Sequence, residues 1–136
     1  STALLELLNE IDRPNVKLGF DAWSPALRGE PLFETARQMA PYTAISTNAD
    51  YIRLPRYRYR SELVNYEREL PDLVRAVPFG EGFIDYPAFF AGLRAGGFDG
   101  IANYEICSPV RGGKIRTTSS RCFVRKTIWL KELSEE

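Results

Sequence analysis

The sequence contains no histidine among its 136 residues. Histidine is the commonest general base at neutral pH, a usual zinc ligand and a member of the Ser-His-Asp and Cys-His arrangements, so these kinds of active site are excluded. Acid–base chemistry in this chain must therefore depend on carboxylates. Cysteine is also scarce: Cys107 and Cys122 are too few for a disulfide framework and lack metal-site spacing, so we expect reduced core residues.

The chain also has no excess of charge and no long hydrophobic run. Its 18 basic residues balance 18 acidic ones, which argues against a protein that coats polyanions. The apolar runs are far shorter than the roughly 20 residues that a membrane-spanning helix needs. Because 44% of the residues are hydrophobic, the chain can form one core. We expect a soluble, cytoplasmic protein with a single domain over residues 1–136 and no membrane partner.

The spacing of apolar residues predicts helices that alternate with short strands. Helices are expected over residues 3–11, 31–41, 85–96 and 121–133, and strands over residues 16–20, 43–47 and 101–106. Residues 21–25 are predicted as a loop. Residues 48–82 sustain no period and are predicted as a long functional loop with one short strand over residues 73–77. This alternation indicates an α/β fold with parallel strands joined by helical crossovers.

Two carboxylates stand at the ends of predicted strands. Asp21 closes the strand over residues 16–20, and Glu105 lies near the end of the strand over residues 101–106. The carboxyl ends of parallel strands form the site face of α/β barrels and open sheets, so both side chains are candidate site residues. Acidic oxygens favour Mg²⁺ or Mn²⁺ over zinc. The alternative is that each carboxylate caps a turn or pairs with an arginine.

Glycines flank Glu81 in the segment Gly80-Glu81-Gly82, shortly before the helix predicted to begin near Asp85. Glycine lets the backbone turn tightly and approach a ligand, and a helix N-terminus favours anionic groups. The same pattern occurs in plain turns. Both a ligand-binding turn and a structural turn stay open at this position.

Arginines alternate with aromatic residues over residues 51–60, which read YIRLPRYRYR. Such a segment can pair phosphates and stack bases. It is equally typical of a solvated edge segment over a shallow core. The zero net charge favours the second interpretation.

Several short motifs follow one another in order along the chain. They are VKLGFDAW over residues 16–23, Ala49-Asp50, GEGFID over residues 80–85, GFDG over residues 97–100, and Tyr104-Glu105. Together they resemble the C-terminal part of sugar phosphate isomerase/epimerase proteins of the xylose-isomerase-like TIM-barrel superfamily. The resemblance implies an α/β fold that is a partial (β/α)₈ TIM barrel, comprising about the last three parallel strands and their helices.

The resemblance also implies a divalent metal, Mg²⁺ or Mn²⁺, held by two glutamates, an aspartate and a histidine. By motif position Asp21 is the aspartate and Glu105 the last glutamate, which in that family also acts as acid/base partner in a proton transfer through an enediol. The family's histidine is expected over residues 45–48, where this chain has none. The first glutamate belongs to a strand that would precede Ser1. Asp50 is the candidate replacement among the metal ligands.

The remaining candidate site residues would contact the substrate, a small carbohydrate or sugar phosphate. They are Trp23, Asn48, Glu81 and Arg111, with Arg53 and Arg56 also available to anchor phosphate or hydroxyl groups. Asn48 is also a candidate metal ligand through its amide oxygen.

Three functional hypotheses follow. The leading one is a sugar isomerase or epimerase that acts by metal-assisted proton transfer and is incomplete without an N-terminal barrel portion. The second is a non-catalytic interaction domain that self-associates or docks a partner chain through open barrel edges. The third is an endonuclease-like protein of the same superfamily that grips a phosphate backbone with residues 51–60. Because such enzymes depend on several histidines, it ranks last, and nucleic acid is not an expected partner.

Overall fold

The computed structural model describes residues 1–105 and divides them into two compact units. One unit comprises residues 1–49 and 84–105, and the other comprises residues 50–83. The helix predicted over residues 121–133, together with Cys107, Arg111 and Cys122, lies outside the described residues. Within residues 1–105, no helix has the length and apolar character to cross a membrane.

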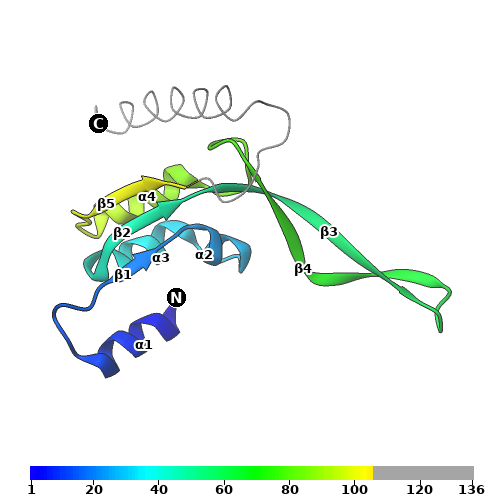
Figure 1. The fold of residues 1–136 in the computed structure, drawn as a ribbon, viewed down its shortest axis with the longest axis horizontal. Coiled ribbons are helices and arrows are strands. Elements are labelled where there is room, and N and C mark those ends of the chain that lie inside the picture. The colour runs from blue at the N-terminus through cyan, green and yellow to red at the C-terminus, as the bar shows by residue number, and fades with distance from the viewer. Residues whose placement is uncertain (106–136) are drawn as a thin grey trace. The chain divides into compact units, whose positions relative to one another are not determined.

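The first unit alternates between helices and strands (Figure 1). Its elements are α1 (Thr2–Ile11), β1 (Leu18–Phe20), α2 (Trp23–Leu27), α3 (Leu32–Met39), the 3₁₀ turn η1 (Ala40–Tyr42), β2 (Thr43–Asn48), α4 (Tyr86–Ala95) and β5 (Ile101–Tyr104). The predicted helices and strands of these segments are confirmed, with shifted ends. The loop predicted over residues 21–25 is wrong in part, because α2 begins there. Asp21 lies just before Ala22, the N-cap of this helix, and its Oδ1 accepts the Ser24 N–H at 2.9 Å.

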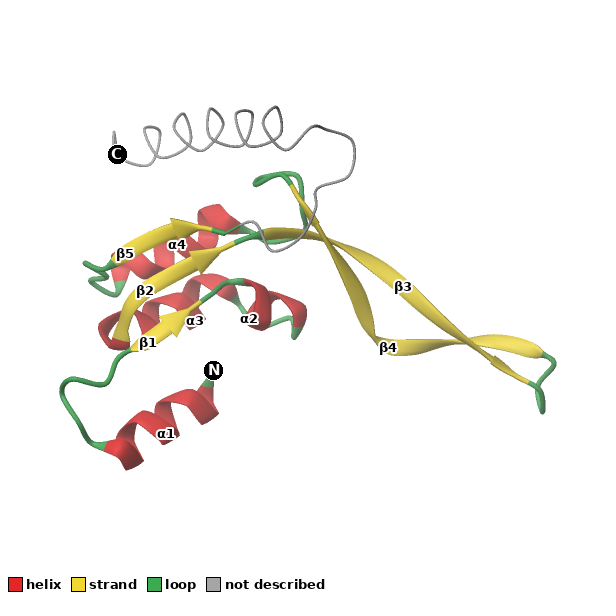
Figure 2. Ribbon diagram, in the orientation of Figure 1, coloured by secondary structure: helices red, strands yellow, loops and turns green. Residues whose placement is uncertain are grey.

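The three short strands form one parallel sheet in the order β1-β2-β5. Phe20 of β1 pairs with Ser46 of β2, which pairs with Ala102 of β5. Helices α3 and α4 cover one face of the sheet (Figure 2). Phe20 lies on this face, because its ring centroid is 5.8 Å from that of Phe89 in α4. This parallel α/β arrangement confirms the predicted α/β class and fits part of a TIM barrel.

The two covering helices approach each other closely because α4 has a glycine at the contact. A Cβ atom at Gly92 would overlap the backbone carbonyl of Phe33 in α3. The residues that fill the core around this contact are Ala36, Met39, Phe89 and Leu93, each almost fully buried. The sequence of α4 therefore sets how near the helix lies to α3.

The beginning of α4 is fixed by a cap and by a buried tyrosine. The Asp85 carboxylate accepts the Ala88 N–H at 3.0 Å, which is the predicted N-cap. Next in the chain, the Tyr86 hydroxyl donates to the Ala49 carbonyl at 2.7 Å. This hydrogen bond fastens α4 to the segment that follows β2.

The second unit is a long antiparallel hairpin made of β3 (Asp50–Arg60) and β4 (Asn65–Val77). The prediction of a long loop over residues 48–82 is therefore wrong, and the short strand predicted over residues 73–77 is only the end of β4. The Arg/Tyr alternation over residues 51–60 is the period of two of a strand, in which neighbouring side chains point to opposite faces.

The hairpin ladder is irregular at one position. The register shifts between Leu54 and Arg56, where Pro55 interrupts β3 and Pro71 lies in the facing part of β4. Proline has no N–H to donate to a ladder, which is why regular pairing stops there. On the outer side of this irregularity, Tyr59 pairs with Tyr66.

Candidate functional site

The carboxyl ends of β1, β2 and β5 bring four polar residues to one edge of the sheet. Thr47 of β2 pairs with Asn103 of β5, and continuing the β1 register by one residue places Asp21 level with both. The Glu105 N–H donates to the Asn48 carbonyl at 2.9 Å, so the ladder extends past β5. Strand alternation puts Asp21, Thr47, Asn103 and Glu105 on the face opposite Phe20.

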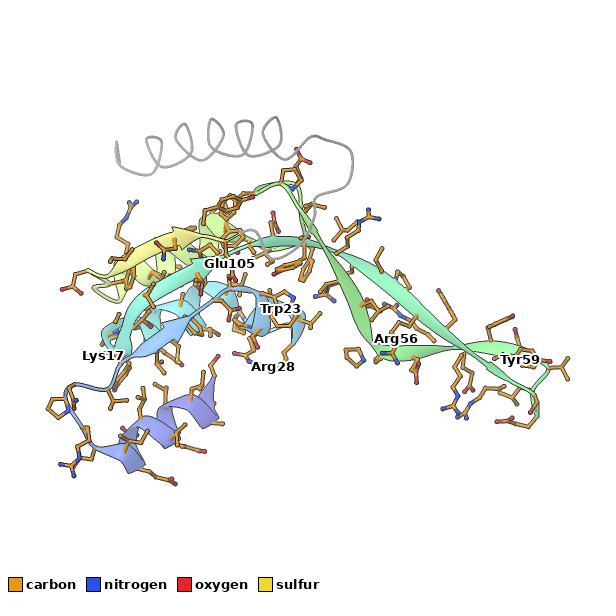
Figure 3. The ribbon with its side chains drawn as sticks, viewed as in Figure 1. Lys17, Trp23, Arg28, Arg56, Tyr59 and Glu105 are labelled. Carbon is orange, nitrogen blue, oxygen red and sulfur yellow. The ribbon has the colours of Figure 1, made fainter. Side chains whose placement is uncertain are left out.

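This edge, which we call the polar edge (Asp21, Thr47, Asn103 and Glu105), is accessible. Asn103 and Glu105 are exposed, and Asp21 and Thr47 are half-buried. Figure 3 shows Glu105 at the end of β5. Two carboxylates, a hydroxyl and an amide can together donate to and accept from the hydroxyl groups of a polar ligand.

Thr47 and Asn103 were missed by the sequence reasoning. The signal was present, because alternation within each strand places Asn103 on the same face as Glu105 and Thr47 on the face opposite Asn48. The range 45–48, where a histidine ligand was expected, presents only Ile45 and Thr47 to the face of the polar edge. Threonine therefore stands where the resemblance places a metal-binding side chain.

Asn48, predicted to bind substrate, has its side chain on the helix-covered face and is 3% exposed. Its Nδ2 donates to the carbonyl oxygens of Ser46 at 3.1 Å and Asn103 at 3.0 Å, and its Oδ1 accepts from the Ser46 hydroxyl at 3.0 Å. Both amide hydrogens are thereby used. The side chain ties β2 to β5 from within the core.

Asp50, predicted as a metal ligand, belongs to the hairpin unit and is 1% exposed. Its Oδ1 accepts the Tyr51 N–H at 2.9 Å, and its Oδ2 accepts the N–H groups of Gly80 at 2.9 Å and Gly82 at 2.8 Å. The two hydrogen bonds from Gly80 and Gly82 hold the turn that contains Glu81 against the start of β3.

The same contacts explain the glycines around Glu81. A Cβ atom at Gly82 would overlap the Asp50 carboxylate and the Tyr51 carbonyl, and Gly80 has a positive φ of 85° that favours glycine. The backbone N–H groups of both glycines are directed at Asp50 rather than at a ligand. The structural-turn interpretation of this segment is thereby favoured, and Glu81 itself is exposed.

Arg53 and Arg56, predicted to anchor phosphate, have contacts within the second unit. Arg53 lies over the Phe83 ring, with its guanidinium carbon 4.4 Å from the ring centroid. Arg56 Nη2 pairs with Glu69 Oε2 at 2.5 Å. Hydrogen bonding to Arg56 holds the pKa of the Glu69 carboxyl below its ordinary value. Trp23 begins α2, two residues after Asp21 (Figure 3).

The described residues do not fit the predicted Mg²⁺ or Mn²⁺ site. Such ions need several oxygen ligands that converge on one point. Within residues 1–105, no three aspartate, glutamate or cysteine side chains gather in a way that could hold a metal ion. Asp50 is also committed to three backbone N–H groups. We therefore assign no chemical step to a metal.

Comparison with known families gives one finding. Residues 2–127 match a family model described as xylose isomerase-like TIM barrel. No curated protein and no solved structure matches the chain. The matched range covers Asp21 and Glu105, and the parallel sheet with helices on one face fits this family's architecture. The chain belongs to the xylose isomerase-like TIM barrel family.

Proposed function

We propose that the chain is a sugar or sugar phosphate isomerase/epimerase-like protein in which Glu105 moves a proton at a carbon next to a carbonyl group. The polar edge carries this proposal. It sets Asp21 and Glu105 at the carboxyl ends of parallel strands in a member of a family that suggests this class of activity. Catalytic residues of TIM barrels come from the ends of several strands on this face.

Glu105 is the acid/base group because its side chain is exposed at this edge and accessible to a ligand. The Glu105 carboxylate takes the proton from the carbon next to the carbonyl, which leaves an enediolate. Delivery of this proton to the former carbonyl carbon, together with transfer of the hydroxyl proton from the second oxygen to the first, isomerises the sugar. Epimerisation needs a second acid that protonates the same carbon from the opposite face, for which Asp21 of the polar edge is the candidate, and both carboxyl groups then regain their starting protonation state from solvent. Asp21, Thr47 and Asn103 would hold the hydroxyl groups of the sugar, and the Trp23 ring would lie against its apolar side.

The proposal leaves some predicted residues without a role in the reaction. Asn48 and Asp50 form hydrogen bonds to the backbone that account for their burial. A substrate-binding role for Glu81 or Arg111 stays a prediction. Members of this family often use divalent metals, but no step above depends on one, because the described residues supply no ligand set.

The test is proton exchange in deuterium oxide, followed by ¹H NMR on a panel of aldoses, ketoses and their phosphates. We expect the wild-type chain to exchange the proton next to the carbonyl of at least one sugar. Glu105→Gln should reduce the rate by about 100-fold or more, the usual range for loss of a general base. The control is Glu62→Gln, an exposed glutamate near the hairpin turn. If no sugar exchanges, or if Glu105→Gln exchanges at the wild-type rate, the proposal is wrong.

A second candidate is a non-catalytic interaction domain that covers its strand edges with another chain. The observation that favours it is the exposed outer strand β5, where Ile101 is 64% exposed. The variant Ile101→Lys should then weaken self-association or partner binding, measured by light scattering. If Ile101→Lys has no effect on the molar mass of the assemblies, this candidate fails.

A further inference from the structure

The hairpin carries an aromatic surface that neither candidate function uses. We call it the tyrosine surface, and it consists of Tyr57 and Tyr59 of β3 and Tyr66 of β4. Their side chains are 61%, 51% and 64% exposed. Tyr59 and Tyr66 pair directly across the ladder, with ring centroids 5.3 Å apart in an edge-to-face arrangement. Tyr57 lies two residues before Tyr59 and so on the same face.

The ribbon that bears this surface consists of two strands. In the part of the chain that the structure describes, β3 and β4 pair only with each other. A two-stranded hairpin is marginally stable in water without a further layer or strand. Leu70 continues the tyrosine face along β4 and is 73% exposed. Clustered apolar and aromatic exposure of this kind is typical of an interaction site.

The charges of the ribbon indicate which class of partner fits. Three of its arginines pair with carboxylates of the same hairpin: Arg56 with Glu69, Arg60 with Glu67 at 2.9 Å, and Arg68 with both oxygens of Asp72 at 2.8 Å. A nucleic-acid groove needs positive charge that is free to replace counterions. Because these three of the six arginines on the two strands are already paired, the ribbon offers less free positive charge than a nucleic-acid groove needs, and it fits an aromatic protein surface better.

We propose that the tyrosine surface is an interface between two copies of this chain, packed face to face about a two-fold axis parallel to the hairpin strands. That axis places β3 of one copy over β4 of the other, with cross-strand partners at the same level along the strand direction. Tyr59 of one copy then meets Tyr66 of the second copy, and Tyr57 meets Arg68. Tyrosine and arginine are both enriched at interface cores, and a guanidinium group binds the face of an aromatic ring.

Charge repulsion disfavours one alternative, the pairing of two β3 edges about Tyr57. If two β3 strands paired about Tyr57, Arg56 of one copy would lie opposite Arg58 of the other. Like charges directly opposite each other destabilise a sheet. Face-to-face packing avoids that contact, and the zero net charge of the chain removes long-range repulsion between copies.

The area involved predicts a weak dimer. An aromatic side chain buries roughly 150–250 Å² when fully covered. With about half of each ring still exposed, six tyrosines from two copies supply roughly 500–900 Å². Leu70 and the arginine stems bring the total toward roughly 1,200 Å², the lower end of specific interfaces. We expect a dissociation constant of roughly 1–100 μM, the weak range for a small interface.

Sedimentation velocity of the full chain from about 1 to 500 μM tests the proposal, since this range brackets the expected constant. Replacing Tyr57, Tyr59 and Tyr66 together by Ser should raise the dissociation constant by about 30-fold or more. The control is Arg58→Ser on the opposite face of β3, which should leave it unchanged. A wild-type monomer at every concentration, or a dimer that the triple variant retains, overturns the proposal.

Two single substitutions probe the geometry of the contact. Tyr57→Lys places a positive charge against Arg68 of the second copy and should dissociate the dimer, whereas Tyr57→Glu should retain it. Because Tyr57 also pairs with Arg68 of its own hairpin, urea unfolding of both variants at about 1 μM, the lower end of the expected range, checks that the hairpin keeps its stability. If both behave alike, the two-fold geometry is wrong. Ile101→Lys distinguishes a dimer through the tyrosine surface from one that pairs through β5. It should leave the first intact and weaken the second. Tyrosine-dependent binding of a DNA duplex at low salt would show a nucleic-acid surface instead and overturn the proposal.

Discussion

Asp50 Oδ2 accepts the backbone N–H of Gly82 at 2.8 Å across 32 residues of sequence. The same oxygen accepts the Gly80 N–H, so a buried carboxylate holds the turn that closes the hairpin. The carboxylate of Asp50 therefore occupies the position that an anionic ligand of this turn would take. The glycines allow the backbone of the turn to approach this carboxylate closely.

Gly82→Ala should destabilise the protein by about 2–4 kcal/mol, because the added methyl group overlaps Asp50 and the Tyr51 carbonyl and overpacks a closed site. The measurement is urea unfolding followed by circular dichroism. The matched control is Gly19→Ala, where the new Cβ atom would lie 3.5 Å from Ile45 in ordinary contact. Equal unfolding midpoints for the two variants would contradict the close approach at Gly82.

Asp50→Asn should destabilise the protein by about 2–4 kcal/mol, because the amide presents a donor to backbone donors and leaves buried N–H groups without an acceptor. Hydrogen exchange at the Gly80 and Gly82 amides should become faster than in the wild type. Asp99→Asn changes an exposed carboxylate and serves as the control. Unchanged exchange at both glycine amides would show that the carboxylate does not hold the turn.

The Arg56–Glu69 pair should respond to acid. The hydrogen bond from Arg56 lowers the pKa of Glu69 in the folded protein. A lowered folded pKa means that the pair's contribution to stability is fully present above the ordinary value of 4.5 and is lost as the pH falls through the folded pKa. NMR titration of the Glu69 carboxyl carbon should show a midpoint below 4.5. Arg56→Gln should move it upward, whereas Arg37→Gln, which removes the partner of Glu34, should not.

Mn²⁺ should find no site built by the polar edge. The reason is that Asp21 and Glu105 lack a third acidic or cysteine partner among residues 1–105. In an electron paramagnetic resonance titration, the wild type, Asp21→Ala and Glu105→Ala should all bind Mn²⁺ with the same affinity. Asp21 and Glu105 should give no saturable Mn²⁺ binding below about 1 mM. Tight wild-type binding that either variant abolishes would establish a metal site at this edge.

The first unit was largely predictable because its signals are local. The Asp85 cap, the apolar stripe of α4 and the stop at Gly96 lie within one short segment, and each acts over one or two helical turns. The parallel class followed from the alternation of helices and strands. The two carboxylates could be placed at strand ends, but their neighbours Thr47 and Asn103 depend on register, which no local pattern contains.

The hairpin was missed for a different reason. Arg56, Tyr57, Arg58 and Tyr59 alternate with a period of two, but the alternation is between charged and aromatic side chains, which does not read as one apolar face. Pro55 and Pro71 also argue against central strands, and the structure accommodates them at the ladder irregularity. The role of Asp50 was beyond local reasoning, because its partners lie about thirty residues away.

Two sets of hydrogen bonds close the base of the hairpin. The Asp50 carboxylate accepts the N–H groups of Gly80 and Gly82, and the Phe83 N–H donates to the Tyr51 carbonyl at 2.8 Å. These contacts hold the start of β3 next to the segment that follows β4, independently of the residues farther along the two strands. Loop-closure entropy grows only slowly with length, so residues between Leu54 and Leu73 can be lengthened, shortened or exchanged without moving the two ends. The strands beyond this base can therefore change in sequence without loss of the contacts that close it.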